Sequence, residues 1–219
     1  MTQISKSSGV TRGASASYLF VKHAVDCYVA LVALILAAPL LTLIFYRIRR
    51  ESDGPVLFRQ TRAGRGGRPF TLYKFRTMRT DADPYGDSPQ SGEDPRITRI
   101  GRWLREKSLD ELPQLLNVLR GEMSLVGPRP LYVQQMAEWD DRQKARLLVK
   151  PGLTGLAQIS GRGSLTIEEK LEWDVRYVEQ ISCGYDLGII WRTLRGDALG
   201  GGIYEVRYSR YKARRSDPQ

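Results

Sequence analysis

The hydrophobic pattern of this 219-residue chain is dominated by one segment, residues 27–46, which contains no charged side chain. A helix rises about 1.5 Å per residue, so this segment would extend roughly 30 Å, the thickness of the hydrocarbon core of a bilayer. Pro39 lies inside the segment, where it removes a backbone hydrogen bond and kinks a helix. We therefore expect residues 18–50 to form a membrane helix with a kink at Pro39.

The charges on both sides of the apolar segment favour a helix that enters the membrane and returns. Lys22 and His23 precede the segment, and arginines follow it at residues 47, 49 and 50. A spanning helix normally carries its basic excess on the cytoplasmic side only, so this arrangement suits a re-entrant helix with both ends in the cytoplasm. An ordinary single span is the chief alternative. A cleaved signal peptide or a buried core helix fits less well, because Pro39 follows the best cleavage site and the segment has no polar face.

Downstream, the pattern predicts a short β-hairpin and then amphipathic helices. Residues 51–62 and 68–78 are rich in Thr, aromatic and branched side chains, and a glycine-rich turn separates them. Apolar side chains at helical spacing then predict four helices, over residues 96–106, 134–149, 167–178 and 187–194.

These elements predict an α+β fold that is predominantly helical. The kinked re-entrant helix would lead into a compact cytosolic domain with a short β-hairpin, and some of its amphipathic helices would lie on the membrane surface. The expected organisation is a flexible tail, a membrane helix, a catalytic domain and a basic tail, over residues 1–17, 18–50, 51–200 and 201–219.

Charge and composition narrow the class of function. Lys and Arg total 34 against 24 Asp and Glu, which gives a net charge of +10. This balance favours anionic partners such as nucleic acid, acidic lipid headgroups or phosphorylated substrates. The single histidine, His23, gives poor support to His-based triads and metal sites. Cys27 and Cys183 predict no disulfide framework. Catalysis would therefore rest on carboxylates, cations and a hard metal ion.

The candidate chemistry is concentrated in residues 108–130, SLDELPQLLNVLRGEMSLVGPRP. Asp110 and Glu111 are adjacent there, and a capping box of Ser108 and Glu111 at a helix start is the structural alternative, which Pro113 fits imperfectly. In the functional interpretation, the helix N-terminus and Arg105 keep Asp110 ionised and nucleophilic. Glu111 would then hold a hard divalent ion such as Mg²⁺ against a diphosphate.

Cations from several segments are candidates for binding the phosphates. Lys74 and Arg76 would lie on one face of the second strand, because strand side chains alternate, and they bind phosphate only if that face looks into the site. Arg129 lies between two prolines, which would hold its guanidinium in a fixed direction for bidentate binding. The candidate phosphate-binding residues are Lys74, Arg76, Arg105, Arg129 and Arg162.

Four motifs in this order resemble a known family. They are KFRTM (74–78), the 108–130 stretch, KPGLTGLAQISGR (150–162) and the helix that bears Asp174. Together they resemble the bacterial sugar transferases, which are monotopic polyprenyl-phosphate hexose-1-phosphate transferases. The resemblance covers about residues 18–199, and the combined pattern is highly specific.

The resemblance implies a reaction and roles for single residues. The family's acidic dyad falls on Asp110 as nucleophile and Glu111 as magnesium ligand, with both carboxylates as candidate Mg²⁺ ligands. Its phosphate-contacting positions fall on Lys74, Arg105, Arg129 and Arg162. In the implied ping-pong reaction, Asp110 attacks the β-phosphate of a UDP-sugar, UMP leaves, and polyprenyl (undecaprenyl) phosphate takes the sugar-phosphate.

The implied location is the cytoplasmic face of the bacterial inner membrane, among phospholipids, at the first membrane step of glycan or exopolysaccharide assembly. The sequence departs from the family pattern at two places. The Ser-Pro pair common at the kink is Ala38-Pro39 here, and the Gly-Arg-Asn common after the glutamine loop is Gly161-Arg162-Gly163.

Two other classes of function compete. A basic membrane-associated scaffold or regulator of polysaccharide assembly would explain the charge without catalysis. A nucleic-acid binder is suggested by charge alone, and since no recognised binding motif supports it, we expect no nucleic-acid partner. The transferred sugar, the glycan pathway and the oligomeric state stay open, a homodimer included.

Overall fold

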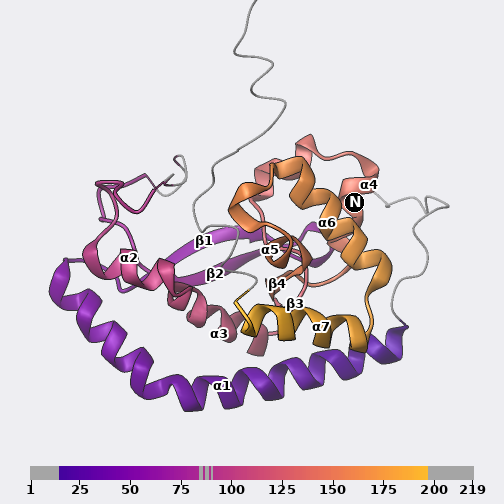
Figure 1. Ribbon diagram of the computed structural model, residues 1–219, viewed down its shortest axis with the longest axis horizontal. Coiled ribbons are helices and arrows are strands. Elements are labelled where there is room, and N and C mark those ends of the chain that lie inside the picture. The colour runs from indigo at the N-terminus through magenta and orange to yellow at the C-terminus, as the bar shows by residue number, and fades with distance from the viewer. Residues whose placement is uncertain (1–14, 84–85, 87–88, 90, 197–219) are drawn as a thin grey trace, which may run out of the picture.

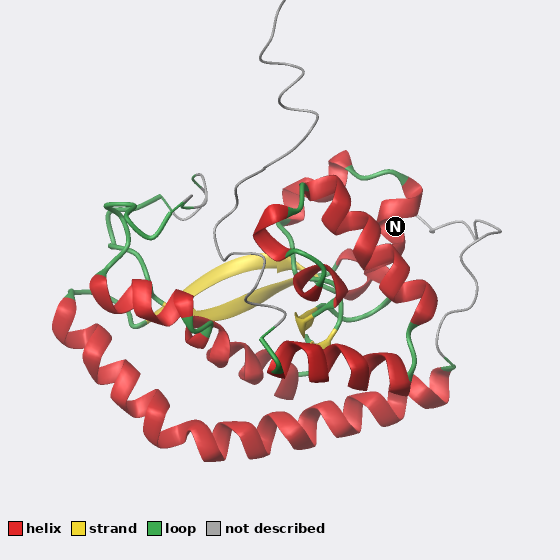
Figure 2. Ribbon diagram, in the orientation of Figure 1, coloured by secondary structure: helices red, strands yellow, loops and turns green. Residues whose placement is uncertain are grey.

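The computed structural model describes residues 15–83, 86, 89 and 91–196. These residues form a mostly helical molecule with two small two-stranded sheets (Figures 1 and 2). The long helix α1 runs along one side, and the other elements gather on its inner side (Figure 1). The tail expected at 201–219 lies outside the described residues, as does most of the tail expected at 1–17.

The apolar segment lies within α1 (Ala16–Glu51), a continuous helix that contains Pro39. In the described part of the chain, α1 is the one helix long and apolar enough to cross a membrane, judged by length and composition. Figure 1 shows that it curves around the rest of the molecule. Thr42 Oγ1 donates to the carbonyl of Ala38 at 2.9 Å, a contact that bends helices. Pro39 and Thr42 therefore favour a bent helix.

α1 has one buried and one exposed apolar face. Ala30, Ile44 and Ile48 are at most 2% exposed and pack against the hairpin and the helices that follow it. The outer face carries exposed apolar side chains along its length, among them Phe20, Val25, Tyr28, Leu36, Leu43 and Phe45. Contiguous apolar surface of this extent is unusual on a soluble monomer. The helix therefore fits association with a membrane.

The predicted hairpin is confirmed. Its strands β1 (Leu57–Ala63) and β2 (Pro69–Phe75) pair antiparallel, with Phe58 opposite Lys74. The turn between them takes positive φ at Gly66 and Gly67, which glycine adopts at little cost. Phe70 and Leu72 pack into the core on the face that also carries Lys74.

The predicted helix over residues 96–106 is observed as α2 (Arg99–Glu106). It lies against the end of the hairpin, and Gly101 makes the approach possible. A Cβ at this position would lie 2.1 Å from the carbonyl oxygen of Thr77, far inside van der Waals contact. The short segments η2 (Leu109–Gln114) and α3 (Leu115–Leu119) follow.

The prediction of one helix over residues 134–149 is wrong. The structure has three short segments there, η3 (Val133–Glu138), α4 (Asp141–Lys144) and η4 (Ala145–Leu148). Trp139 is extended between the first two, and the carboxylate of Asp140 accepts a hydrogen bond from the Gln143 amide at 2.7 Å. A side-chain cap of this kind starts a new helix instead of continuing an old one.

The second sheet and the last two helices complete the fold. β3 (Ser124–Val126) pairs in parallel with β4 (Gly152–Thr154). Val126 packs against Tyr177 and Val178 of the last-but-one helix. The helices predicted over 167–178 and 187–194 are confirmed as parts of α6 and α7. The remaining elements are α5 (Leu156–Ile159), η5 (Arg162–Ser164), α6 (Ile167–Gln180) and α7 (Cys183–Leu194).

Candidate active site

Asp110 and Glu111 lie on η2, a 3-10 segment, and each is 8% exposed. Ser108 precedes them with φ 55° and ψ 21° and makes no capping hydrogen bond with its side chain. The capping-box interpretation is therefore wrong, since an N-cap takes an extended conformation. Instead, the Ser108 hydroxyl accepts a hydrogen bond from the Arg162 guanidinium at 3.2 Å.

Two residues beside the acidic pair have strained backbone conformations. Among the described residues, Ser108 and Arg162 are the two non-glycine residues with positive φ, at 55° and 46°. Each such conformation costs on the order of 1–3 kcal/mol, and such strain tends to cluster at functional sites. The hydrogen bond between these two residues places η5 next to Ser108, two residues before Asp110.

Two cations hold Glu111. Lys74 Nζ lies 2.8 Å from Glu111 Oε1, and an Arg129 nitrogen lies 2.9 Å from the same oxygen. Burial alone would raise the pKa of Glu111, but Arg129 and Lys74 together hold that pKa well below its usual range. Glu111 is therefore ionised, and its Oε1 is already shared by two cations.

The carboxylate of Asp110 is held much less tightly. Within the described residues its one ion-pair partner is Lys74, at 4.0 Å. Burial raises the pKa of Asp110. Lys74 lowers that pKa, and repulsion from Glu111 raises it. From the sequence we expect nearby cations to keep Asp110 ionised. In the structure Lys74, Arg105 and Arg129 favour the ionised form while burial acts against them, so ionisation of Asp110 stays a prediction.

Arg105 and Arg76 have different surroundings. Arg105 Nε donates to Thr77 Oγ1 at 2.8 Å, and its charge is near enough to act on Asp110. Arg76 instead donates to the carbonyl of Ser52 at 2.7 Å, just past the end of α1. β2 ends at Phe75, so strand alternation does not carry Arg76 onto the face of Lys74. Arg76 ties the hairpin to α1, and its contacts give no support to the predicted phosphate contact.

The backbone of Arg129 is supported by a buried ion pair that the sequence reading missed. Arg146 donates to the carbonyl of Arg129 and pairs with Asp174 at 2.8 Å, and the two side chains are 2% and 3% exposed. The Arg146 guanidinium also stacks over the ring of Trp139, 4.9 Å from its centroid. Arg146 lies in the segment predicted as one amphipathic helix over residues 134–149, and that prediction gave no sign of its buried contacts.

Arg62 is a second missed residue near the pair. Its guanidinium lies 3.7 Å from the ring centroid of Tyr132 and donates to the side chain of Gln60. Its charge is close enough to interact with Arg129 and Glu111, while burial lowers its pKa. Strand alternation puts residues 58, 60 and 62 on one face of β1, and Phe58 is opposite Lys74. The alternation along β1 is the sequence signal that could have indicated Arg62, once the pairing with β2 is known.

Comparison with known proteins decides the family. The model of the family described as bacterial sugar transferase matches residues 17–197 of this chain. The chain belongs to the bacterial sugar transferase family. The acidic pair, Lys74, Arg105, Arg129 and Arg162 all lie within the matched residues.

Curated relatives share sequence with this sugar transferase over most of its length. EpsL of Bacillus subtilis (strain 168), an uncharacterized sugar transferase, is 40% identical over 87% of this chain and 93% of EpsL. The UDP-glucose:undecaprenyl-phosphate glucose-1-phosphate transferase of Caulobacter vibrioides is 47% identical over 79% of this chain and 68% of that protein. The galactosyl transferase CpsE of Streptococcus agalactiae serotype III is 42% identical over 85% of this chain but 44% of CpsE.

The coverage shows that this sugar transferase corresponds to nearly all of EpsL and to less than half of CpsE. The family match makes the chain an enzyme of the sugar transferase class, in preference to the non-catalytic scaffold.

Proposed function

We propose that this sugar transferase moves a sugar-1-phosphate from a UDP-sugar to polyprenyl phosphate, with undecaprenyl phosphate as the acceptor, and releases UMP. The observation that carries the proposal is the difference between the two carboxylates. Glu111 is engaged by two cations, whereas Asp110 lies beside them at 4.0 Å from Lys74. Relatives named for this reaction, among them those of Caulobacter vibrioides and Escherichia coli, support it.

The first half-reaction uses Asp110 as nucleophile. A carboxylate oxygen of Asp110 forms a bond to the β-phosphorus of the UDP-sugar. The bond from that phosphorus to the bridging oxygen breaks, and its electron pair leaves with UMP. The product is an aspartyl-phosphosugar, an acyl-phosphate intermediate of a type carboxylates form.

The second half-reaction restores Asp110. An oxygen of polyprenyl phosphate attacks the same phosphorus, and the bond to Asp110 breaks, which returns the carboxylate. Lys74, Arg105, Arg129 and Arg162 would neutralise the non-bridging oxygens as charge builds up in each transfer. Arg162 bonds to Ser108, two residues before Asp110, and its charge interacts with those of Glu111 and Asp110, which supports a phosphate-binding role for Arg162.

The acidic pair suits a magnesium ion that is also bound by the oxygens of a diphosphate. The described residues contain no cluster of three or more His, Cys, Asp or Glu side chains that could hold a metal by themselves. Mg²⁺ commonly takes one or two carboxylates and completes its shell with water and substrate phosphates. Both cations contact Oε1 of Glu111, which leaves Oε2 and the Asp110 carboxylate as ligands. When bound, the ion would supply positive charge to the diphosphate oxygens.

The membrane brings the lipid acceptor to the site. α1 carries exposed apolar side chains along its outer face, and its inner face packs on the hairpin that supplies Lys74. A helix embedded at the cytoplasmic face of the inner membrane would therefore hold the acidic pair near the level of the lipid phosphates. Re-entry at Pro39 would keep both helix ends on that face.

The test is Asp110→Asn, with Asp141→Asn as the matched control, because the Asp141 side chain is 94% exposed. We expect D110N to lose UMP release and the covalent sugar-phosphate adduct while its unfolding temperature stays within a few degrees of the wild type. Incubation with a UDP-sugar and Mg²⁺ without acceptor, followed by intact-protein mass measurement, detects the adduct. Full UMP release by folded D110N would sink the covalent mechanism.

A further inference from the structure

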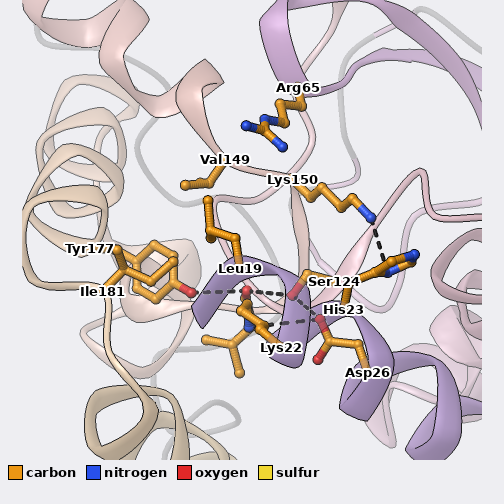
Figure 3. A pocket seen from close by; sticks show the side chains of 11 residues that line it. Leu19, Lys22, His23, Asp26, Arg65, Ser124, Val149, Lys150, Tyr177 and Ile181 are labelled. Atoms are coloured by element: carbon orange, nitrogen blue, oxygen red, sulfur yellow. Dashed lines mark hydrogen bonds and ion pairs between the residues drawn. The ribbon is translucent and has the colours of Figure 1, made fainter. Parts of the chain in front are cut away.

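A basic cavity lies against the first turns of α1, and neither the acidic pair nor its cations line it (Figure 3). Its volume is about 30 Å³, which exceeds what one water molecule needs. Lys22 and His23 of α1, Arg65 of the hairpin turn and Lys150 just before β4 line it. In Figure 3, Arg65 and Lys150 approach from the side opposite to the α1 residues.

The acidic groups near this cavity are already paired. Lys22 Nζ lies 2.6 Å from Asp186 and 3.8 Å from Asp26. Asp26 also accepts a hydrogen bond from the Ser124 hydroxyl at 2.6 Å, and Asp186 accepts further bonds from Tyr18 and Tyr177. This network fastens the start of α1 to β3, α6 and α7. It also means that Asp26 and Asp186 compensate Lys22 and each has little left for another cation.

Arg65 and Lys150 line the cavity without a carboxylate at ion-pair distance among the described residues. The ammonium of Lys150 donates to His23 Nδ1 at 3.1 Å. Burial lowers the pKa of Lys150; Cys27 and Asp26 act against this shift, and Arg65 and Lys22 act with it. Two cations that repel each other across a cavity are stabilised by an anion between them.

We propose that this cavity binds a phosphate group, and that the group belongs to a phospholipid headgroup. An arginine and a lysine facing one space can both donate charge-assisted hydrogen bonds to phosphate oxygens. The outer face of the same turns of α1 carries Phe20, Val21 and Val25, which are 52% to 77% exposed. If these side chains enter the acyl region, the cavity on the inner face lies at the level of lipid phosphates. The proposal does not depend on the reaction proposed above.

The bound headgroup would hold the first turns of α1 at a fixed depth in the membrane. The ion pairs of Lys22 with Asp26 and Asp186 orient α1 relative to the rest of the domain. A lipid phosphate in contact with Arg65 and Lys150 would in addition orient the domain relative to the bilayer. Lys150 lies just before β4, whose partner β3 is followed in the chain by Arg129.

The test measures thermal unfolding of the full-length protein in a neutral detergent as ligand is added. The ligands are short-chain phosphatidylglycerol, the matching diacylglycerol without phosphate, and inorganic phosphate. The test variant is Arg65→Gln with Lys150→Gln. Its control is Arg68→Gln with Lys144→Gln, which removes the same charge from the same turn and from a helix outside the cavity.

We expect phosphatidylglycerol, but not diacylglycerol, to raise the unfolding temperature of the wild type and of R68Q/K144Q. In R65Q/K150Q the phosphatidylglycerol concentration for half of this effect should rise at least about tenfold, because two charge-assisted contacts are lost. Phosphate binding at the acidic pair is common to all variants, so it cancels in the comparison. If the double variant does not fold, R65Q alone carries the test, since Arg65 is exposed.

An equal response of R65Q/K150Q and R68Q/K144Q to phosphatidylglycerol would overturn the proposal. Equal stabilisation of the wild type by phosphatidylglycerol and by inorganic phosphate, lost in R65Q/K150Q, would support a phosphate site and overturn the lipid as its source.

Discussion

Asp110 and Glu111 are neighbours in the chain but differ in their electrostatics. Glu111 receives both Lys74 and Arg129 on one oxygen, so its pKa falls although it is buried. Asp110 is buried to the same degree, has Lys74 only at 4.0 Å and feels the charge of Glu111, so its pKa rises. A carboxylate with a raised pKa is a stronger base and nucleophile once it is ionised. The proposed division of roles rests on which side chain the cations reach.

Lys74→Met should move the acid limb of activity to higher pH. Lys74 is the cation that lowers the pKa of Asp110 most, so its loss lets burial and Glu111 raise that pKa further. A nucleophilic carboxylate must be ionised, so the rate climbs as pH rises through this pKa, and the climb should start later. The measurement is kcat/KM for UMP release over a pH series, with Lys144→Met as control. A midpoint that stays in place or falls would contradict this assignment.

Asp174→Asn should destabilise the protein by about 3 kcal/mol, because it leaves the charge of Arg146 buried without its partner. Arg146 and Asp174 are 2% and 3% exposed. Glu172→Gln is the control: Glu172 pairs with Arg142 on the surface, where both side chains are 41% or more exposed, and its loss should cost less than about 1 kcal/mol. Denaturant unfolding in detergent compares the two. Equal losses would mean that the buried pair is not the support we infer for Arg129.

At the scale of elements, the long and strongly patterned ones were predicted and the short ones were not. The helices α2, α6 and α7 follow from apolar periodicity. α1 follows from its long uncharged apolar run, and the hairpin from its strand-prone residues and glycine-rich turn. The segment over residues 133–148 broke into three pieces because Asp140 caps a new helix. Local capping competes with periodicity over so few residues, and a hydrophobic pattern does not reveal which one wins.

Gly101→Ala should displace α2 and lower activity. The added Cβ would lie 2.1 Å from Thr77 O, so the helix or the end of the hairpin must move, and the bond between Arg105 and Thr77 would be strained. A displacement of about 1 Å near reacting groups can reduce the rate by tenfold or more. Gly184→Ala in α7 is the matched control, since no atom lies within 4 Å of its Cβ.

UMP release and unfolding temperature should be measured for both glycine variants. We expect G184A to be as stable as the wild type or more so, because alanine favours a helix. If G101A kept full activity and stability, α2 would not need its close contact with Thr77.

At the scale of the whole molecule, one long apolar helix packs against the elements that carry the site. The inner face of α1 contributes to the cores around the hairpin, α2 and α3, and its first turns bond to β3 and α7. The route of α1 through the membrane stays a prediction.

A single cysteine at residue 5, in a Cys27→Ser and Cys183→Ser background, tests the re-entrant path. If the helix returns at Pro39, both of its ends lie on the cytoplasmic side. A membrane-impermeant maleimide should then label residue 5 only from that side, as it should label Asp141→Cys in the catalytic domain. Labelling of residue 5 from outside intact spheroplasts would establish a single span instead.

The sequence by itself determined the apolar helix, the hairpin, the helical character of the fold and the family. These follow from patterns that are local or contiguous, such as the uncharged residues 27–46 and the motif over residues 108–130. It also placed Lys74, Arg129 and Arg162, because the motifs that carry them were visible.

Only the tertiary structure decided which side chains meet. Ser108 takes a left-handed conformation, and Arg162, more than fifty residues away, donates a hydrogen bond to its hydroxyl. Arg76 donates to the carbonyl of Ser52 at the end of α1, and Arg146 donates to the backbone carbonyl of Arg129. Burial raises the pKa of Asp110. These outcomes depend on burial and on distances between segments far apart in the chain. Neither burial nor these distances can be derived from the local sequence pattern, because both depend on how distant segments pack.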